Sequence, residues 1–360
     1  MPPSPQYAAL SYCWGTSTPF ITTSSTLAER CNRISILDMP PTLREAVQVA
    51  RDLDIRYLWI DALCIIQGRD AAAQADWAYE SGRMNGAYTN ANLTIVAAAS
   101  TDCIGGLIDG ERTCTVPYRG QNGSSTAVLG MNGPDDITPP SFSDAAGRVS
   151  FNNQPICNRA WTYQEWILSS RLLVFTTVGI YLVCGERELP TFHIAQQLRL
   201  PRPDELSSGP FYWSLVVHDF CAKRMTNPTD KLPAIAGLAQ RFHEISGGAL
   251  GRYYAGLWEV DLAVSLLWRV IDPVAQAAGM LSYDAVVNPE RGRRFGRGGK
   301  ARAPSWSWAA VDGPLMTFCM TWEKKKPATI EARVVACETN PAPGHDSFGQ
   351  IEFGRYLRLY

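Results

Sequence analysis

Hydrophobic and polar positions alternate along the first hundred residues in the manner of short strands separated by amphipathic helices. The β-rich runs at 7–10, 56–60 and 93–98 predict strands. Apolar residues recur at helical spacing over 42–50 and 72–88, which predicts helices between them. Strands that alternate with helices form right-handed βαβ units. We therefore expect an α/β fold with a mainly parallel sheet and flanking helices.

The start of the first predicted helix carries a capping signal. Thr42 follows Pro40-Pro41 and stands three residues before Glu45, the spacing of a capping box. We therefore expect Thr42 to be the N-cap of this helix.

The pattern changes after residue 100. Residues 101–155 lose the alternation and are dominated by Gly, Pro, Ser, Asn and Asp around their middle, which predicts a long surface insertion. A short helix at 158–168 and two strands, at 172–177 and 180–184, then resume the first pattern. We place the first domain at 1–190, with the insertion inside it.

The remainder, 191–360, has a different pattern of apolar and polar residues, and we expect it to be an extension packed on the first domain. Helical spacing over 211–221, 230–245 and 254–268 predicts three helices, and a β-rich portion begins at Pro304. A Gly/Arg-rich segment, 291–302, carries six basic residues. A solvated loop is favoured there over a phosphate site.

Charge and composition exclude several classes of protein. The 360 residues include 33 Lys and Arg against 34 Asp and Glu, so the net charge of -1 gives no general attraction to nucleic acid or anionic lipid. The longest nearly apolar stretch, 172–184, is shorter than the ~20 residues of a membrane span. The chain starts without a secretory signal, and its ten cysteines include no C-x-x-C pair. We expect a cytoplasmic protein with reduced thiols.

The first candidate for chemistry is Asp61, which follows a predicted strand. Open α/β sheets bind ligands at the carboxyl ends of their strands, and Asp61 stands in an otherwise apolar run from Leu58 to Ile66. A structural role as a helix cap or ion-pair partner is equally compatible with this position. Trp14 follows the first predicted strand and would line the same crevice, although a core position also accommodates it.

A second cluster lies in the short helix at 158–168. Trp161 and Glu165 are four residues apart and therefore share a helix face, with Arg159 just before the first turn. Beside an apolar wall, Glu165 would have a raised pKa and act as an acid, a base or a stabiliser of a cation. A plain structural Arg–Glu pair is the alternative.

Other familiar sites are absent from the sequence. The histidines have no H-E-x-x-H spacing, and there is no G-x-S-x-G elbow or intact phosphate loop. Cys64 is a conceivable nucleophile, but its apolar neighbours favour an inert thiol. No metal ion or cofactor is implied.

Three sequence blocks carry a family resemblance. They are Ala9-Leu10-Ser11-Tyr12-Cys13-Trp14-Gly15, the segment from Leu43-Arg44-Glu45-Ala46 to Tyr57-Leu58-Trp59-Ile60-Asp61-Ala62-Leu63-Cys64-Ile65-Ile66-Gln67, and Arg159-Ala160-Trp161-Thr162-Tyr163-Gln164-Glu165. In order and spacing they closely resemble the HET (heterokaryon incompatibility) domain of filamentous fungi, over about 7–185. Pro304-Ser305-Trp306-Ser307-Trp308 is similar to the region that often follows this domain.

The resemblance implies an effector of nonself recognition and programmed cell death. HET domains are distantly similar to TIR domains, which have a flavodoxin-like fold and in some members cleave NAD at the nicotinamide–ribose bond. By this analogy Glu165 is the first candidate for a catalytic carboxylate and Asp61 the second. Candidate substrate-binding residues come from the same blocks: Ser11, Trp14, Tyr57, Cys64, Arg159, Trp161 and Gln164.

Two alternatives to catalysis on NAD stay open. One is a non-catalytic signalling module that self-associates or binds a sensor protein, and the other is a scaffold reused as a biosynthetic enzyme on a small organic substrate. Family members usually carry a further strand before the first block, whereas six residues precede Tyr7 here. We therefore expect either a shortened chain or a short stand-alone form.

Overall fold

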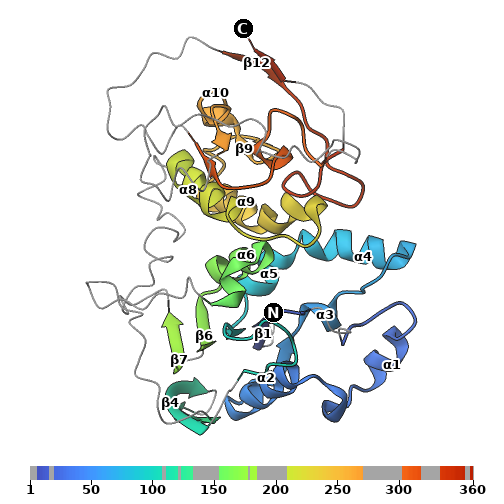
Figure 1. Ribbon diagram of the computed structural model, residues 1–360, viewed down its shortest axis with the longest axis vertical. Helices are drawn as coiled ribbons and strands as arrows, with labels where there is room; N and C mark the ends of the chain where they lie inside the picture. Colours follow the sequence, from blue (N-terminus) through green and yellow to red (C-terminus); the bar gives the residue numbers. More distant parts are fainter. Residues whose placement is uncertain are drawn as a thin grey trace. The chain divides into compact units, whose positions relative to one another are not determined.

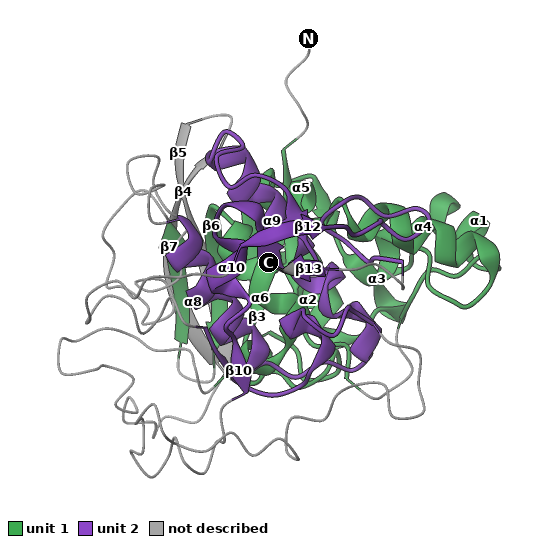
Figure 2. Ribbon diagram, turned by 90° about the horizontal axis from the view of Figure 1, so that it is seen from above, with its two compact units in different colours: residues 1–196 green, residues 197–360 purple. Residues whose placement is uncertain are grey.

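The chain divides into two compact units, residues 1–196 and 197–360 (Figures 1 and 2). The structure is a computed structural model, and it describes residues 6–15, 20–107, 111–120, 123–132, 154–176, 179–184, 209–270, 302–317, 333–352 and 357–359. Each unit has its own buried core and is described separately below.

A five-stranded sheet forms the centre of the first unit. Its strands lie in the order β2-β1-β3-β6-β7, with bounds β1 Tyr7–Ser11, β2 Tyr57–Trp59, β3 Leu93–Ala97, β6 Arg171–Thr176 and β7 Gly179–Cys184. The first four are parallel, and β7 pairs antiparallel with β6 at the edge. The α/β fold with a mainly parallel sheet is confirmed, and the order β2-β1-β3 is that of doubly wound sheets.

Alternate residues of the strands face two separate apolar clusters. On one face Leu10, Ile95 and Phe175 pack with Leu43 and other residues of a long helix, α2. On the other face Val96 and Val174 pack with Ile156 and with Trp166 of helix α6 (Ala160–Leu168). Because strand side chains alternate between faces, Ser11 at the end of β1 points to the α6 side.

The helices of the first unit are short apart from two. Their bounds are α1 Leu27–Asn32, α2 Pro41–Asp52, α3 Asp61–Cys64, α4 Ala71–Ser81, α5 Met84–Thr89 and α6 Ala160–Leu168. The single helix expected over 72–88 is therefore two helices. The break falls at Gly82, which ends α4 and has a poor helix propensity.

The expected capping role of Thr42 is wrong. Pro40 is the N-cap of α2 and Pro41 its first residue, since proline fits the first turn, where no amide donor is needed. Thr42 is buried inside the helix, and its hydroxyl accepts from the amide of Gly106 at 3.1 Å. Glu45 accepts from the amide of Leu107 at 2.6 Å. The two side chains hold the loop after β3 instead of capping their own helix.

The insertion after this loop contains a hairpin that the composition did not predict. Strands β4 (Glu111–Gly120) and β5 (Gly123–Asn132) pair antiparallel along their whole length. The Gly-, Ser- and Asn-rich composition obscured a strand pattern of ten residues in each arm.

In the second unit, two helices agree with the predictions and a third does not. Helices α8 (Gly209–Cys221) and α9 (Pro233–Ile245) form, whereas 254–268 holds a hairpin of β8 (Tyr253–Tyr254) and β9 (Leu257–Trp258) before the short helix α10 (Leu262–Ser265). Gly256, in the hairpin turn, has φ +101°, and a Cβ there would lie 2.5 Å from Trp308 Nε1. This turn excludes a continuous helix.

The C-terminal part of this unit carries small strands. They are β10 Arg269–Val270, β11 Leu315–Met316, β12 Val334–Cys337 and β13 Leu357–Leu359, paired as β10-β11 and β12-β13. The β-rich prediction for this region is confirmed in that limited form.

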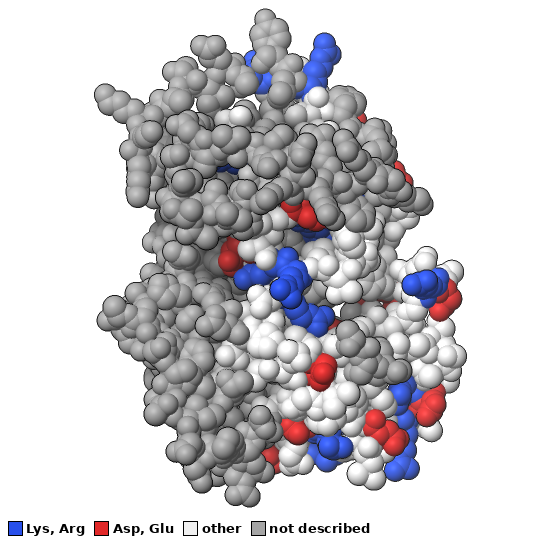
Figure 3. Space-filling view, viewed as in Figure 1, with Lys and Arg blue, Asp and Glu red and all other residues white. Residues whose placement is uncertain are grey.

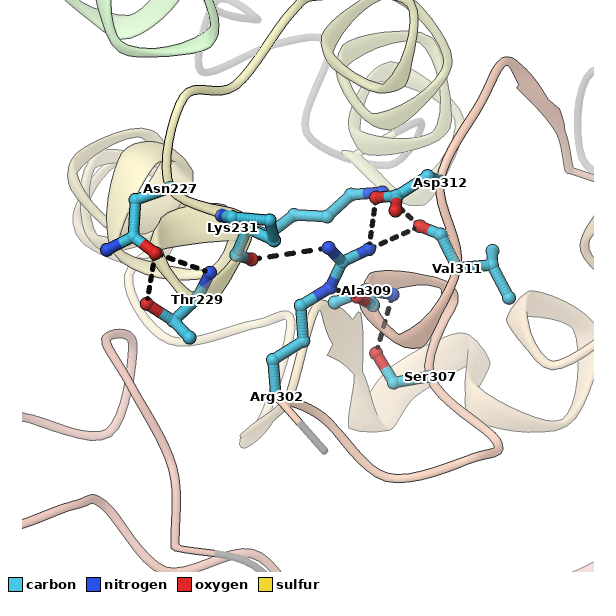
Figure 4. A network of polar contacts seen from close by, with 9 residues as sticks. Asn227, Thr229, Lys231, Arg302, Ser307, Ala309, Val311 and Asp312 are labelled. Carbon is cyan, nitrogen blue, oxygen red and sulfur yellow. Dashed lines mark hydrogen bonds and ion pairs between the residues drawn. The ribbon is translucent and has the colours of Figure 1, made fainter. Parts of the chain in front are cut away.

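Arg302 organises a buried polar network in the second unit (Figure 4). Its guanidinium donates to the carbonyls of Ala309 at 2.6 Å and Val311 at 2.8 Å, and it pairs with Asp312. Lys231 also donates to the Val311 carbonyl. Arg302 is 6% exposed, so the expected solvated loop is wrong at this residue, while 291–301 lie outside the described residues.

The surface is mixed in charge. On the face drawn in Figure 3, basic and acidic side chains of the described residues are interspersed among uncharged ones. Among the described residues, no helix combines the length and the apolar composition that crossing a membrane requires.

Candidate functional site

The candidate site lies where two neighbouring parallel strands end. Ser11 is the last residue of β1, and Asp61 follows β2 as the first residue of α3. Because β1 and β2 are parallel and adjacent, their carboxyl ends open at the same edge of the sheet. The chain passes from β1 to β2 on one side and then to β3 on the other side of β1. The winding of the sheet therefore reverses between β1 and β3, beside Ser11.

Glu165 on α6 is joined to this edge from the other face of the sheet. The Ser11 hydroxyl donates to Oε2 of Glu165 at 2.5 Å, and both side chains are buried. Tyr88 of α5 lies beside them; its hydroxyl donates to the Leu10 carbonyl at 3.2 Å and also bonds to Glu165. Three elements therefore hold one carboxyl group.

The surroundings of Glu165 favour its protonated form. Burial, the largest cause, and the negative charge of Asp61 together raise the pKa of its carboxyl to about 8. The bonds from Ser11 and Tyr88 and the charge of Arg159 act in the opposite direction without offsetting the burial. At neutral pH Glu165 is therefore mainly an uncharged acid.

Asp61 is held by two donors and remains half-buried. Trp14 Nε1 donates to Oδ2 at 3.0 Å, and the amide of Ala62 donates to Oδ1 at 2.7 Å. Burial raises the pKa of Asp61 to about 6, with these two donors and Arg159 lowering it. Asp61 is therefore mainly ionised at neutral pH, and it and Glu165 differ in charge state at the same site.

Arg159, just before α6, supplies the positive charge. It lowers the pKa of both carboxyl groups, and its side chain bonds to the thiol of Cys13. Cys13 is buried, and burial raises the pKa of its thiol, so it stays protonated. Arg159 itself is half-exposed and adjoins two acids of which one is ionised.

The remaining candidates on α6 point to different neighbours. Trp161 is half-buried and packs edge-on against Trp77 of α4, with ring centroids 6.4 Å apart. Gln164 is completely buried in the core of the unit. The shared helix face of Trp161 and Glu165 thus continues from a half-buried aromatic ring to a buried acid.

Two candidates do not join this group. Tyr57 is the first residue of β2 and pairs in register with Tyr7, four residues before Ser11, so it lies ~13 Å away at the opposite edge of the sheet. It is 49% exposed. Cys64 ends α3 with its residue exposed, and desolvation raises the pKa of its thiol above the usual value. It has none of the activation expected of a nucleophile.

Tyr88 is the site residue that the residue chemistry alone missed. Its ring is 1% exposed and packs edge-on against Trp59 of β2, with centroids 5.4 Å apart. The sequence shows it only as an aromatic on an apolar helix face. The signal that would have found it is its phenol, since a buried tyrosine hydroxyl needs a polar partner.

The blocks that build this site match a known family. Residues 7–165 match the family model described as Heterokaryon incompatibility protein (HET). This stretch is a HET domain. The matched range starts at β1 and ends at Glu165, so it spans the four central site residues: Ser11, Trp14, Asp61 and Glu165. No curated protein and no solved structure matches the chain at a significant level.

The arrangement of the HET domain offers acid–base and electrostatic chemistry. A half-buried ionised carboxylate, a buried neutral acid and an arginine lie together, and the indole N–H of Trp14 bonds to the ionised carboxylate. Within the described residues, no three His, Cys, Asp or Glu side chains gather in the manner of a metal site.

Proposed function

We propose that the HET domain of this heterokaryon incompatibility-type protein is a cell-death effector that hydrolyses the nicotinamide–ribose bond of NAD. The observation that carries the proposal is the pair formed by Asp61 and Glu165, whose environments separate their charge states at the ligand-binding edge of a doubly wound sheet. The distant similarity of HET domains to TIR domains supplies the reaction class as an analogy.

The bond to be broken sets what the residues must do. Nicotinamide leaves as a neutral base because its ring nitrogen is already positive in NAD, so it takes the bonding electron pair and needs no proton. The ribose carbon becomes an oxocarbenium ion, water adds to it, and the water's proton passes to a base. A fixed negative charge near that carbon stabilises the transition state.

Asp61 suits this role better than Glu165, although the family resemblance favours Glu165. Asp61 is ionised near neutral pH and half-buried, whereas Glu165 is 4% exposed and mainly protonated. In this proposal Asp61 faces the ribose and accepts the proton from water. Glu165 is a positioning residue that holds the end of β1 through Ser11.

The indole rings and the arginine would bind the rest of the molecule. Trp161 packs edge-on against Trp77, and in this proposal the face of its indole ring stacks on a flat base. Arg159 carries a charge suited to a phosphate oxygen. Both side chains are half-exposed.

The test is incubation of the purified chain with NAD, followed by chromatography of nicotinamide and ADP-ribose. We expect turnover in the wild type and a loss in kcat of about 10²–10³-fold in Asp61→Asn. Glu165→Gln should keep activity within about tenfold, because an amide is neutral like the protonated acid. Asp38→Asn, at an exposed position on the same unit, is the matched control.

Two results would reject the proposal. The first is the absence of nicotinamide release by the wild type at high protein concentration, and the second is unchanged turnover in Asp61→Asn. If cells expressing Asp61→Asn die as readily as those expressing the wild type, self-association becomes the better explanation of the killing activity.

A further inference from the structure

A pocket in the second unit lies entirely outside the HET domain. It has a volume of about 630 Å³ and is lined by the end of α9, by the β8–β9 hairpin and by the segment from Cys337 to Phe348. Pockets for small ligands have volumes of ~300–1,000 Å³, so this one has the size of a small-molecule site. All of its lining residues belong to one compact unit.

Aromatic rings form one wall of the pocket. Phe348 lies 5.4 Å from the ring of Tyr253 and 5.7 Å from that of His243, measured between centroids. Behind them the buried Trp258 stacks on His243 at 6.1 Å with an interplanar angle of 7°. The rings come from three separate segments, and Phe348 is half-exposed. Such a wall accepts a flat apolar body.

Two polar atoms of this wall lack a partner. The hydroxyl of Tyr253, a residue only 5% exposed, and Nδ1 of His243 make no hydrogen bond to any described residue. A buried tyrosine hydroxyl normally has a partner, and leaving it without one costs free energy. The half-exposed Phe348 ring packs against both residues, so both of these atoms belong to side chains of the same pocket wall.

The charges around the pocket favour a cation. The lining contains two carboxylates, Glu259 and Glu338, and among its described residues one guanidinium, Arg252. The carboxylates act on the pocket, because both raise the pKa of the Cys337 thiol in addition to the effect of its burial. Glu259 is exposed at the rim, with one oxygen accepting from the amide of Arg252 at 2.9 Å.

We propose that this pocket binds a small organic cation, a primary amine with a flat apolar body. The body lies against Tyr253 and Phe348, where a cation also gains from the ring faces. The ammonium group donates to the Tyr253 hydroxyl and to the carboxylates of Glu259 and Glu338. The second unit is thereby a receptor for an amine, separate from the chemistry of the HET domain.

The test is calorimetric titration of the full chain with three probes that share one body: phenethylamine, 3-phenylpropionate and 2-phenylethanol. We expect saturable one-to-one binding of phenethylamine, weaker binding of the alcohol and none of the carboxylate. Tyr253→Phe should weaken phenethylamine about tenfold, and Glu338→Gln about threefold. Tyr212→Phe and Glu352→Gln, which change the same residue types outside the lining, should leave binding unchanged.

Stability measurements separate a binding role from a structural one. Tyr253→Phe removes a hydroxyl that has no partner among the described residues, so the protein without ligand should unfold at the same temperature or a higher one. The proposal is overturned if phenethylamine does not bind at millimolar concentrations, if the carboxylate binds as well as the amine, or if both pocket variants bind like the wild type.

Discussion

The Ser11 hydroxyl and Oε2 of Glu165 lie 2.5 Å apart although 154 residues separate them in the chain. Ser11 ends the first strand of the sheet, and Glu165 belongs to the helix that leads into its fourth parallel strand. A carboxyl group that is mainly neutral at pH 7 can accept this bond without bringing a buried charge. The pair joins the start and the end of the stretch that matches the HET family.

The first prediction concerns stability against pH. The pKa of the Glu165 carboxyl is 4.5 in the unfolded chain and about 8 in the folded protein. Between these two pH values the folded state keeps a proton on Glu165 that the unfolded state has released. The free energy of unfolding therefore falls as the pH rises through this range. Glu165→Gln removes this contribution, so its stability relative to the wild type should increase between about pH 5 and about pH 8.

Urea unfolding at several pH values measures this difference. Glu29→Gln, on the exposed surface of α1, should follow the wild type at every pH. Parallel curves for Glu165→Gln and the wild type would show that the carboxyl titrates normally in the folded protein.

The second prediction concerns the indole of Trp14. Its N–H bond to Asp61 favours the ionised carboxylate, so Trp14→Phe, which keeps a ring but removes the donor, should move the pKa of Asp61 upward from about 6. A carbon-detected NMR titration of the Asp61 carboxyl measures the change. Trp77→Phe, whose ring packs on Trp161, should leave this pKa in place; an equal shift in both variants would argue against the bond.

The third prediction follows from the turn after Trp14. Gly15 has φ +79°, and a Cβ there would lie 2.2 Å from Cβ of Asp102. Gly15→Ala should cost about 1–2 kcal/mol for the left-handed backbone and about 1–3 kcal/mol for the steric overlap. Gly247→Ala, at φ +57° with open space around it, should show only the backbone cost. Equal losses in the two variants, measured by chemical unfolding, would exclude the contact with Asp102.

The fourth prediction concerns Arg302. Arg302→Leu leaves the Ala309 carbonyl without its donor and should destabilise the second unit by at least about 1–3 kcal/mol. Arg241→Leu removes an exposed pair with Glu244 and should change stability by about 0–1 kcal/mol. Thermal unfolding compares the two, and similar melting temperatures would mean that the network adds nothing.

The fifth prediction links the proposed reaction to pH. If the ionised carboxylate of Asp61 is the catalytic group, kcat for NAD should rise as the pH passes about 6 and then level off. A profile that instead rises through about pH 8 would assign the essential carboxylate to Glu165. Initial rates across the pH range distinguish the two.

The regular elements of the HET domain could be predicted from local patterns. Strands β1, β2 and β3 and helix α2 lie within a few residues of their expected positions, because their apolar spacing is set by the faces they bury. The capping-box spacing of Thr42 and Glu45 was not a reliable signal, because the same spacing suits side chains that bind another loop. The hairpin around Gly256 escaped it because two-residue strands leave no periodicity.

The site could be predicted only in part. Strand ends drew attention to Trp14 and Asp61, which the structure bonds together. The contact of Ser11 with Glu165 has no local signal, because it depends on how the sheet and α6 pack. Tyr57 belongs to the same sequence block as Asp61 and was therefore predicted to join the site. It is the first residue of the three-residue strand β2, however, so it lies at the amino ends of the strands, opposite to the site.

The insertion between β3 and α6 departs and returns on opposite sides of the sheet. Leu107, before the β4–β5 hairpin, belongs to the cluster on the α2 side, and Ile156, after the insertion, belongs to the cluster on the α6 side. Layers on the two faces of a sheet lie ~20 Å apart, about 10 Å on either side. A shortened chain that lacks the β4–β5 hairpin therefore needs a linker of at least about six extended residues to reach from one face of the sheet to the other. An ordinary hairpin begins and ends on the same side, so a linker of about two residues would replace it.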